Sequence, residues 1–114
     1  MRRLRLAAAQ LGPIQKAESR AAVVDRLGDL VDAAARDGAD LVVYPELALT
    51  TFFPRWYMTD QAEVDAWFER RMPNEATAPL FRRAGELGIA ISFGYAELTA
   101  EGRHFNTSIL TDRT

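Results

Sequence analysis

One carboxylate stands out in the sequence because it directly follows a run of apolar residues. Leu41 to Tyr44 form this run, Pro45 interrupts it, and Glu46 comes next, with apolar Leu47 to Leu49 behind it. A carboxyl group held between a buried strand and an apolar loop loses hydration, which raises its pKa and suits it to general acid–base work. We therefore take Glu46 as a candidate for proton transfer. The alternative is that Glu46 caps a turn and points into water.

The other polar candidates favour simpler interpretations. His104 precedes an apolar strand, and we expect a solvated hairpin residue rather than a catalyst. Two arginine pairs, Arg70-Arg71 and Arg82-Arg83, are interpreted as solvated helix faces, with a nucleic-acid patch as the less favoured alternative. Asn106 and Ser108 occupy the polar face of the last strand, from which they can hydrogen-bond a neighbouring loop.

An aromatic segment without a clear period follows Glu46. Its large side chains are Phe52, Phe53, Trp56 and Tyr57. They form either the wall of a pocket or a small core of their own, and we favour the core.

The elements that must position these residues follow from apolar periodicity, caps and breakers. The sequence predicts strands at 4–9, 41–44, 89–96 and 105–110, and helices at 20–37, 61–72 and 75–87. Ser19 is expected to cap the first helix and Asp60 the second. Strands that alternate with helices favour an α/β fold with a mostly parallel sheet, and the closing hairpin adds an antiparallel edge.

Composition excludes several classes of function. The chain has 114 residues, which suits one domain, and its net charge of -2 gives no overall attraction to nucleic acid or to an anionic membrane. No apolar run is long enough to span a bilayer. There is no cysteine, one histidine and a single lysine, Lys16, so we expect neither a metal site nor a cysteine nucleophile within these residues. Without cysteines or a targeting segment, the expected location is the cytoplasm.

Four segments of the chain resemble the N-terminal part of the carbon–nitrogen hydrolase (nitrilase) superfamily. They are Ala9-Gln10 after the first strand, Arg36 to Asp40, Leu41 to Glu46, and Phe105 to Leu110. Within the superfamily, the block from Pro45 to Trp56 and the block from Gly94 to Leu98 are similar to N-carbamoyl-D-amino-acid amidohydrolases.

This resemblance implies a fold and a mechanism. The family fold is an αββα sandwich, and the family's catalytic set is a glutamate, a lysine and a cysteine. The family's glutamate falls on Glu46. It takes the thiol proton and returns it to the departing ammonia, the lysine stabilises the oxyanion, and water releases the enzyme-bound carbamoyl group. The implied substrate is an N-carbamoyl amino acid or an amide, and no metal or organic cofactor is implied.

The chain departs from the family pattern because neither a lysine nor a cysteine follows Glu46. Lys16 lies upstream, and we do not assign the family's lysine role to it. Residues 1–114 are therefore expected to be a single incomplete domain, the N-terminal part of a carbon–nitrogen hydrolase, and inactive alone. The alternatives are an inactive truncated fragment or interaction module, and another amidase or nitrilase branch.

The incomplete sandwich also predicts an association surface. Three helices can cover one face of a four-stranded sheet, and the second sheet of the sandwich would cover the other. Without that second sheet, we expect Val42, Tyr44, Ile91 and Phe93 to leave a contiguous apolar surface. The chain is then expected to be a homo-oligomer or to depend on a complementary C-terminal part.

Overall fold

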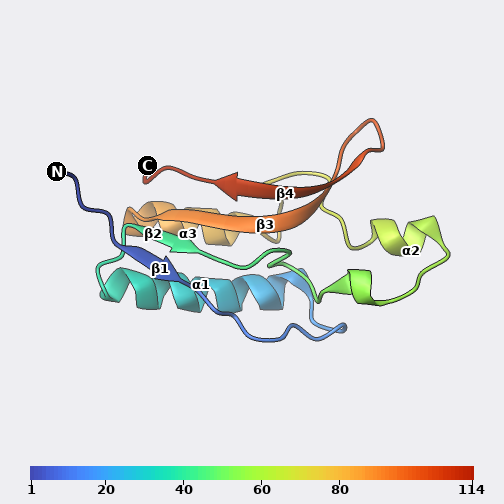
Figure 1. The fold of residues 1–114 in the computed structure, drawn as a ribbon, viewed down its shortest axis with the longest axis horizontal. Helices are drawn as coiled ribbons and strands as arrows, with labels where there is room; N and C mark the ends of the chain where they lie inside the picture. Colours follow the sequence, from blue (N-terminus) through green and yellow to red (C-terminus); the bar gives the residue numbers. More distant parts are fainter.

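The computed structural model describes residues 1–114 and has an α/β architecture (Figure 1). In chain order the elements are β1 (Leu6–Ala8), α1 (Arg20–Arg36), β2 (Leu41–Val43), the 3-10 turn η1 (Phe53–Arg55), α2 (Gln61–Asp65), α3 (Ala78–Leu87), β3 (Ala90–Leu98) and β4 (His104–Leu110). Both termini lie at one end of the sheet, and α2 lies beyond the other end. No helix has the length and apolarity that crossing a membrane requires.

The four strands form one mixed sheet in the order β1-β2-β3-β4. The first three strands are parallel, and β4 runs antiparallel to β3 as its hairpin partner. In the register, Val42 lies opposite Ile91, and Phe93 lies opposite Ile109. The predicted α/β class, with parallel strands and a terminal hairpin, is confirmed.

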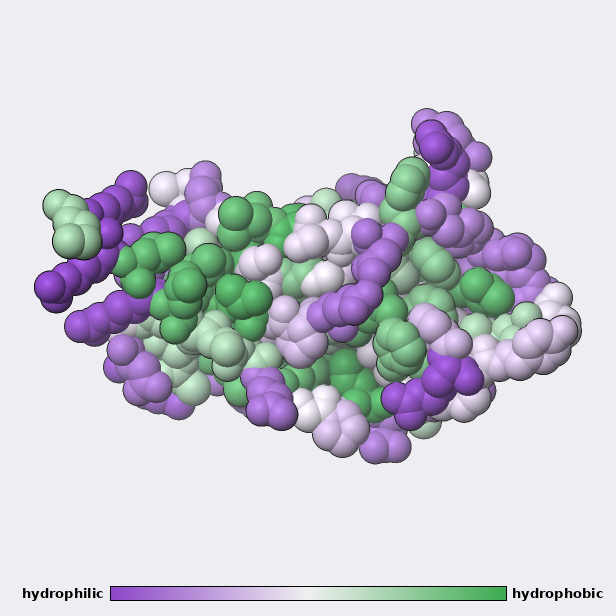
Figure 2. All heavy atoms as spheres, in the orientation of Figure 1, coloured by the Kyte–Doolittle hydropathy of each residue, from purple (hydrophilic) through white to green (hydrophobic).

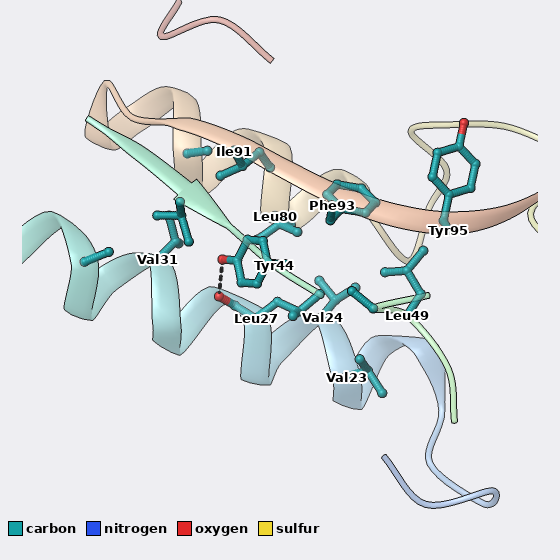
Figure 3. Close-up of a cluster of buried hydrophobic side chains, with 14 of the residues drawn as sticks. Val23, Val24, Leu27, Val31, Tyr44, Leu49, Leu80, Ile91, Phe93 and Tyr95 are labelled. Atoms are coloured by element: carbon teal, nitrogen blue, oxygen red, sulfur yellow. Dashed lines mark hydrogen bonds between the residues drawn. The ribbon is translucent and has the colours of Figure 1, made fainter. Parts of the chain in front are cut away.

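The hydrophobic core lies between this sheet and the helices α1 and α3 (Figure 3). Helix α1 buries one face, which comprises Val23, Val24, Leu27, Val31 and Ala34. The sheet contributes Val42, Tyr44, Ile91 and Phe93, all at most 5% exposed. We expected these four residues on the uncovered face, and that prediction is wrong. Alternation along a strand separates its two faces, but it does not say which face the helices cover.

The opposite face of the sheet has no helical layer over it, and we call it the open face. The loop after β2 covers the part of this face around Gly94 and Ala96. It carries the residues that alternate with the core positions. Val43 on β2 and Leu110 on β4 both lie opposite Ser92 of β3, and they are 41% and 68% exposed. Leu6 on β1 is 63% exposed. Apolar atoms gather at the end of the molecule near the termini, whereas polar atoms intervene further along it (Figure 2).

The helix starts follow their caps, but two predicted helices are too long. The Ser19 side chain accepts a hydrogen bond from the Ala22 amide at 3.1 Å, and Asp60 accepts one from Ala62 at 3.0 Å, as caps should. Helix α2 ends at Asp65 rather than near Pro73, and α3 begins at Ala78 rather than at 75.

The start of α3 is displaced because a separate turn precedes it. Within this turn the Asn74 amide donates to the Thr77 hydroxyl at 2.8 Å, and the Thr77 amide donates to the Asn74 side chain at 3.0 Å. These reciprocal bonds satisfy two backbone donors that have no partner within the helix at its N-terminal end. Pro79, at the first turn of α3, fits a helix that begins there.

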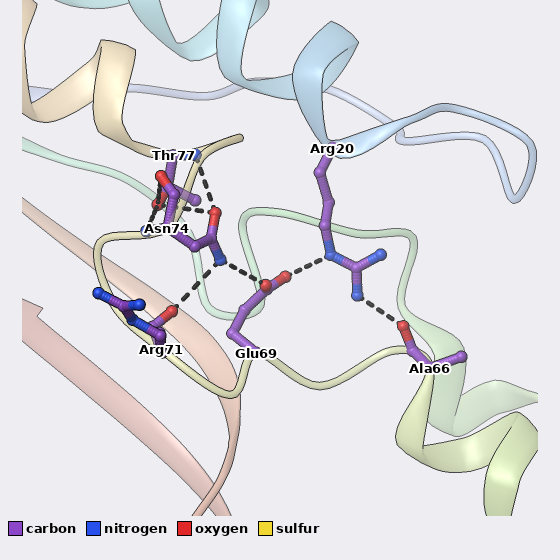
Figure 4. A network of polar contacts seen from close by, with 6 residues as sticks. All are labelled: Arg20, Ala66, Glu69, Arg71, Asn74 and Thr77. Carbon is purple, nitrogen blue, oxygen red and sulfur yellow. Dashed lines mark hydrogen bonds and ion pairs between the residues drawn. The ribbon is translucent and has the colours of Figure 1, made fainter.

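A buried polar network holds the segment between α2 and α3 (Figure 4). The Glu69 side chain is buried, and its carboxylate accepts hydrogen bonds from the Arg20 guanidinium and, at 2.9 Å, from the side-chain amide of Asn74. Arg20 also donates to the Ala66 carbonyl at 2.7 Å. The network joins the start of α1 to a segment that pairs with β3 through Glu69 and Glu97.

Candidate functional site

Glu46 lies where the chain leaves β2 and bends over β3. The bend is fixed by two backbone hydrogen bonds to the same residue. The Gly94 amide donates to the Pro45 carbonyl at 3.3 Å, and the Ala48 amide donates to the Gly94 carbonyl at 2.9 Å. Glu46 and Leu47 are the two residues between these anchors, so they lie directly over Gly94.

Gly94 is required here by close approach rather than by its own backbone angles. A Cβ added to Gly94 would lie 3.0 Å from the Cα of Glu46 and 3.2 Å from the amide nitrogen of Leu47. Leu47 itself has a φ of 47°, which is uncommon for a residue with a side chain. Its buried side chain packs with Phe53 and Ala96, and this packing holds the unfavourable conformation in place.

The carboxylate of Glu46 has one protein partner. The Asn106 side-chain amide donates a hydrogen bond to Oε1 of Glu46 at 2.5 Å. Asn106 lies opposite Ala96 in the β3–β4 pairing, on the open face of the sheet. The prediction that Asn106 contacts a neighbouring loop is confirmed, and that loop carries Glu46. Ser108 does not share this contact.

Glu46 is exposed, whereas we expected it to be partly desolvated. The physical reason is its place on the open face, which no other layer covers in this chain. The carboxylate nevertheless borders concave surface, because Glu46 contributes to three cavities. One has a volume of about 330 Å³ and includes Lys16 and Trp56, and a second has about 300 Å³ and includes Phe52 and His104. The third, of about 330 Å³, follows β2 to β4.

The aromatic segment divides between core and surface. Phe53 is buried and stacks on Trp67, with ring centroids 5.8 Å apart, so the predicted small core exists. Phe52 and Tyr57 are 49% and 94% exposed, and for these two residues the core prediction is wrong. Trp56 is half-buried, and both Lys16 and Arg55 place their cationic groups over its ring, at 5.0 and 5.4 Å from the centroid.

His104 is exposed, as predicted, but it has defined partners. Its Nε2 lies 2.7 Å from the Asp65 carboxylate, and its ring meets Phe68 edge-on at 4.7 Å. The hydrogen bond from His104, followed by one from Gln61, lowers the pKa of Asp65 below its ordinary value. These contacts join α2 to the start of β4, so His104 serves this junction.

Both arginine pairs are exposed, as predicted, but only Arg82 and Arg83 lie on a helix. Arg70 and Arg71 follow the end of α2 in a non-helical segment, so the helix-face prediction is wrong for that pair. Arg83 on α3 bonds Asp32 of α1 at 2.6 Å and Glu86 at 3.3 Å, so it joins the two helices at their surface. No group of three or more histidine, aspartate and glutamate side chains lies close enough together to hold a metal ion.

Sequence reasoning missed Gly94 as a part of this site, although a signal was present. A glycine inside an apolar strand marks a place where another backbone approaches closely. It also missed the association of Lys16 and Arg55 with the cavity at Glu46. No spacing rule relates these two residues, because only the fold brings the segment before α1 against the loop after β2.

The structure is an α/β protein of nitrilase-like fold, with a mixed sheet and a layer of helices on one of its faces. A family model described as carbon-nitrogen hydrolase matches residues 5–114, and the chain belongs to this family.

Solved structures agree with this assignment at the level of the fold. Nit3 from Saccharomyces cerevisiae, a member of branch 10 of the nitrilase superfamily, matches with a TM-score of 0.74 at 18% identity, over 96% of this chain and 40% of that one. A glutamate-to-glutamine variant of the amidase from Nesterenkonia sp. AN1, with acrylamide added to its active-site cysteine, matches with a TM-score of 0.70 at 20% identity, over 97% of this chain and 40% of that one.

The glutamine-dependent NAD+ synthetase from Acinetobacter baumannii also matches, with a TM-score of 0.63 at 20% identity, over 96% of this chain and 19% of that one. The chain therefore spans less than half the length of each of these three proteins.

Proposed function

We propose that Glu46 is the proton-transferring residue of an amidohydrolase that cleaves the carbamoyl C–N bond of N-carbamoyl amino acids. The observation that carries this proposal is the position of the Glu46 carboxylate at the end of β2. The backbone of Glu46 is held over Gly94, and its carboxylate bonds Asn106 and borders a cavity. Membership of the carbon-nitrogen hydrolase family supports the reaction class. The blocks from Pro45 to Trp56 and from Gly94 to Leu98 support the carbamoyl substrate.

In the proposed reaction, Glu46 carries a proton in both half-reactions. It first takes the proton of a cysteine thiol, whose sulfur attacks the carbamoyl carbon, and it gives that proton to the terminal nitrogen, which leaves as ammonia. Glu46 then takes a proton from water while the hydroxide adds to the carbonyl carbon of the resulting thiocarbamate. The C–S bond breaks, the sulfur regains the proton, and the N-carboxy amino acid that is released loses carbon dioxide.

The thiol in this scheme must come from outside residues 1–114, because the chain contains no cysteine. Similarity to an amidase with an active-site cysteine supports a thiol nucleophile. We also place the oxyanion-stabilising lysine outside this chain, since the ammonium of Lys16 lies over Trp56. We use the term completed enzyme for this chain joined to the lysine- and cysteine-bearing remainder of a similar hydrolase.

Ammonia release from N-carbamoyl-D-amino acids tests the proposal. We expect activity from the completed enzyme, none from the isolated chain, and a loss of at least about 100-fold in kcat for Glu46→Gln in the completed enzyme. The substitution keeps the shape of the side chain but removes its basic oxygen. Full activity of Glu46→Gln, or a correctly folded completed enzyme that releases no ammonia, would contradict the assignment.

We further propose that the open face is covered in the functional assembly by a second copy or by a complementary C-terminal part. The exposed apolar side chains of Leu6, Val43 and Leu110 support this proposal. Size-exclusion chromatography with light scattering should show the isolated chain self-associating, and less so for Leu110→Ser. A stable wild-type monomer at all concentrations would contradict it.

A second candidate is an amidase that acts on simple amides, which the similarity to solved amidases supports. Both candidates use Glu46 in the same way and differ only in the group on the carbonyl carbon. A panel that contains N-carbamoyl-D-amino acids, their L enantiomers and short aliphatic amides separates them. Preference for the aliphatic amides would favour the amidase branch.

A further inference from the structure

We propose that Asn106 is a positioning residue for Glu46: it binds one carboxylate oxygen and leaves the other free to exchange the proton. This inference rests on the proposed function of Glu46. The structure gives Oε1 a hydrogen bond from the Asn106 amide and gives Oε2 no protein partner. A base needs one oxygen with an unoccupied lone pair facing the reacting group, and this arrangement provides it.

The bond to Asn106 restrains a side chain that is otherwise free to move. Glu46 is exposed, and a glutamate without contacts populates several rotamers about its side-chain bonds. Asn106, in contrast, sits within the β3–β4 ladder, where it lies opposite Ala96. The backbone of Glu46 is held separately by its close seat on Gly94. The residue is thus held at its backbone by β3, through Gly94, and at its carboxylate by β4, through Asn106.

An amide is well suited to this role for a chemical reason. The donating nitrogen of asparagine is neutral and does not ionise, so it orients the carboxylate without cancelling its charge. Arginine or lysine at this position would form an ion pair, which stabilises the charged carboxylate and makes it a poorer proton acceptor. Preorganisation of a reacting group is worth large factors in rate, because small displacements of catalytic groups are costly.

Kinetics of the completed enzyme test this inference with three variants. For Asn106→Ala we expect kcat to fall about 10- to 100-fold while KM changes less than about twofold, because only the placement of the base is lost. For Asn106→Asp, which keeps the volume, we expect a similar or larger loss and an acid limb of the pH–rate profile that moves to higher pH. Two carboxylates at hydrogen-bond distance resist being ionised together. The ionised, active form of the base therefore appears only at a higher pH.

Ser108→Ala is the matched control, since Ser108 lies two residues along β4 on the same face and does not contact Glu46. We expect its kcat to remain within about twofold of the parent value. The pH profile separates positioning from a structural role, because a variant that only destabilises the sheet loses active protein without moving the acid limb. If Asn106→Ala does not fold, the isosteric Asn106→Asp variant still decides the question.

Two results distinguish the inference from the proposed function. If Glu46→Gln abolishes activity but both Asn106 variants keep kcat within twofold and an unchanged pH profile, then Asn106 does not position the base and the inference is overturned. If Glu46→Gln itself retains full activity, the proposed function fails first. Loss in the Asn106 variants together with a shifted acid limb and an unaffected control supports the inference.

Discussion

Replacing Gly94 with alanine tests the claim that close contact between the backbones of Gly94 and Glu46 sets the position of Glu46. The added Cβ would lie 3.0 Å from the Cα of Glu46, whereas ordinary van der Waals contact begins at 3.4 Å. The loop must therefore retreat by about 0.4 Å, and the hydrogen bonds from Gly94 to Pro45 and from Ala48 to Gly94 must lengthen. Inserting one carbon into packed structure costs about 1–3 kcal/mol. We expect Gly94→Ala to lower the free energy of unfolding by that amount.

Gly28→Ala provides a control with the opposite expected sign. Gly28 lies inside α1, and nothing stands within 4 Å of the position that its Cβ would occupy. Alanine in a helix interior is favoured over glycine by about 0.5–1 kcal/mol, so this variant should be more stable than the parent. Urea unfolding followed by tryptophan fluorescence measures both variants. An unchanged or increased stability for Gly94→Ala, with the expected gain for Gly28→Ala, would refute the close-contact reasoning.

Three further predictions concern groups away from this seat. Arg20→Met leaves the buried Glu69 carboxylate without its cation and should cost about 3 kcal/mol in urea unfolding, whereas Glu69→Gln, which keeps the hydrogen-bonding shape, should cost less. Tyr44→Phe removes the 2.6 Å hydrogen bond from the phenol to the Leu27 carbonyl and should lower the free energy of unfolding by about 1 kcal/mol. Burial raises the pKa of the Tyr44 phenol, so this group should not ionise in the folded protein at pH 10.

The third prediction concerns pH. The hydrogen bond from His104 lowers the pKa of Asp65 in the folded chain, so the ionised carboxylate stabilises the fold above pH 3.8, the ordinary pKa of the group. This contribution is lost as the pH falls from 3.8 through the lower pKa of the folded state. Thermal melts should thus show a smaller acid-induced loss for Asp65→Asn.

Local sequence signals determined most of the secondary structure, and the failures have a tertiary cause. Helix α1 was predictable because its apolar period and the Ser19 cap agree with each other. The predicted second helix extended too far because Trp67 and Phe68 continue the helical spacing. In the structure, the next residue pairs with β3 instead: the Glu69 amide donates to Ala96 at 2.7 Å. A strand contact formed across the fold overrides the local preference.

The candidate site was partly predictable for a similar reason. The position of Glu46 follows from the end of an apolar strand, and the reach of Asn106 follows from the polar face of another. The exposure of Glu46 was not predictable from these patterns, since it depends on which face the helices cover. Burial of Glu69 was also unexpected, because a charged residue suggests solvent exposure, and its partner Arg20 lies 49 residues away in the sequence.

The open face links the proposed chemistry to the proposed association. Glu46 and Asn106 lie on the same uncovered side of the sheet as Val43 and Leu110. In the proposed assembly, a layer over Val43 would also lie close to the carboxylate and exclude water from it, because Val43, Glu46 and Asn106 line the same cavity. Because desolvation strengthens the charge interactions of a reacting group, the proposed contact would both stabilise the assembly and prepare the base. Assembly and activity should therefore rise together as the complementary part is titrated against this chain.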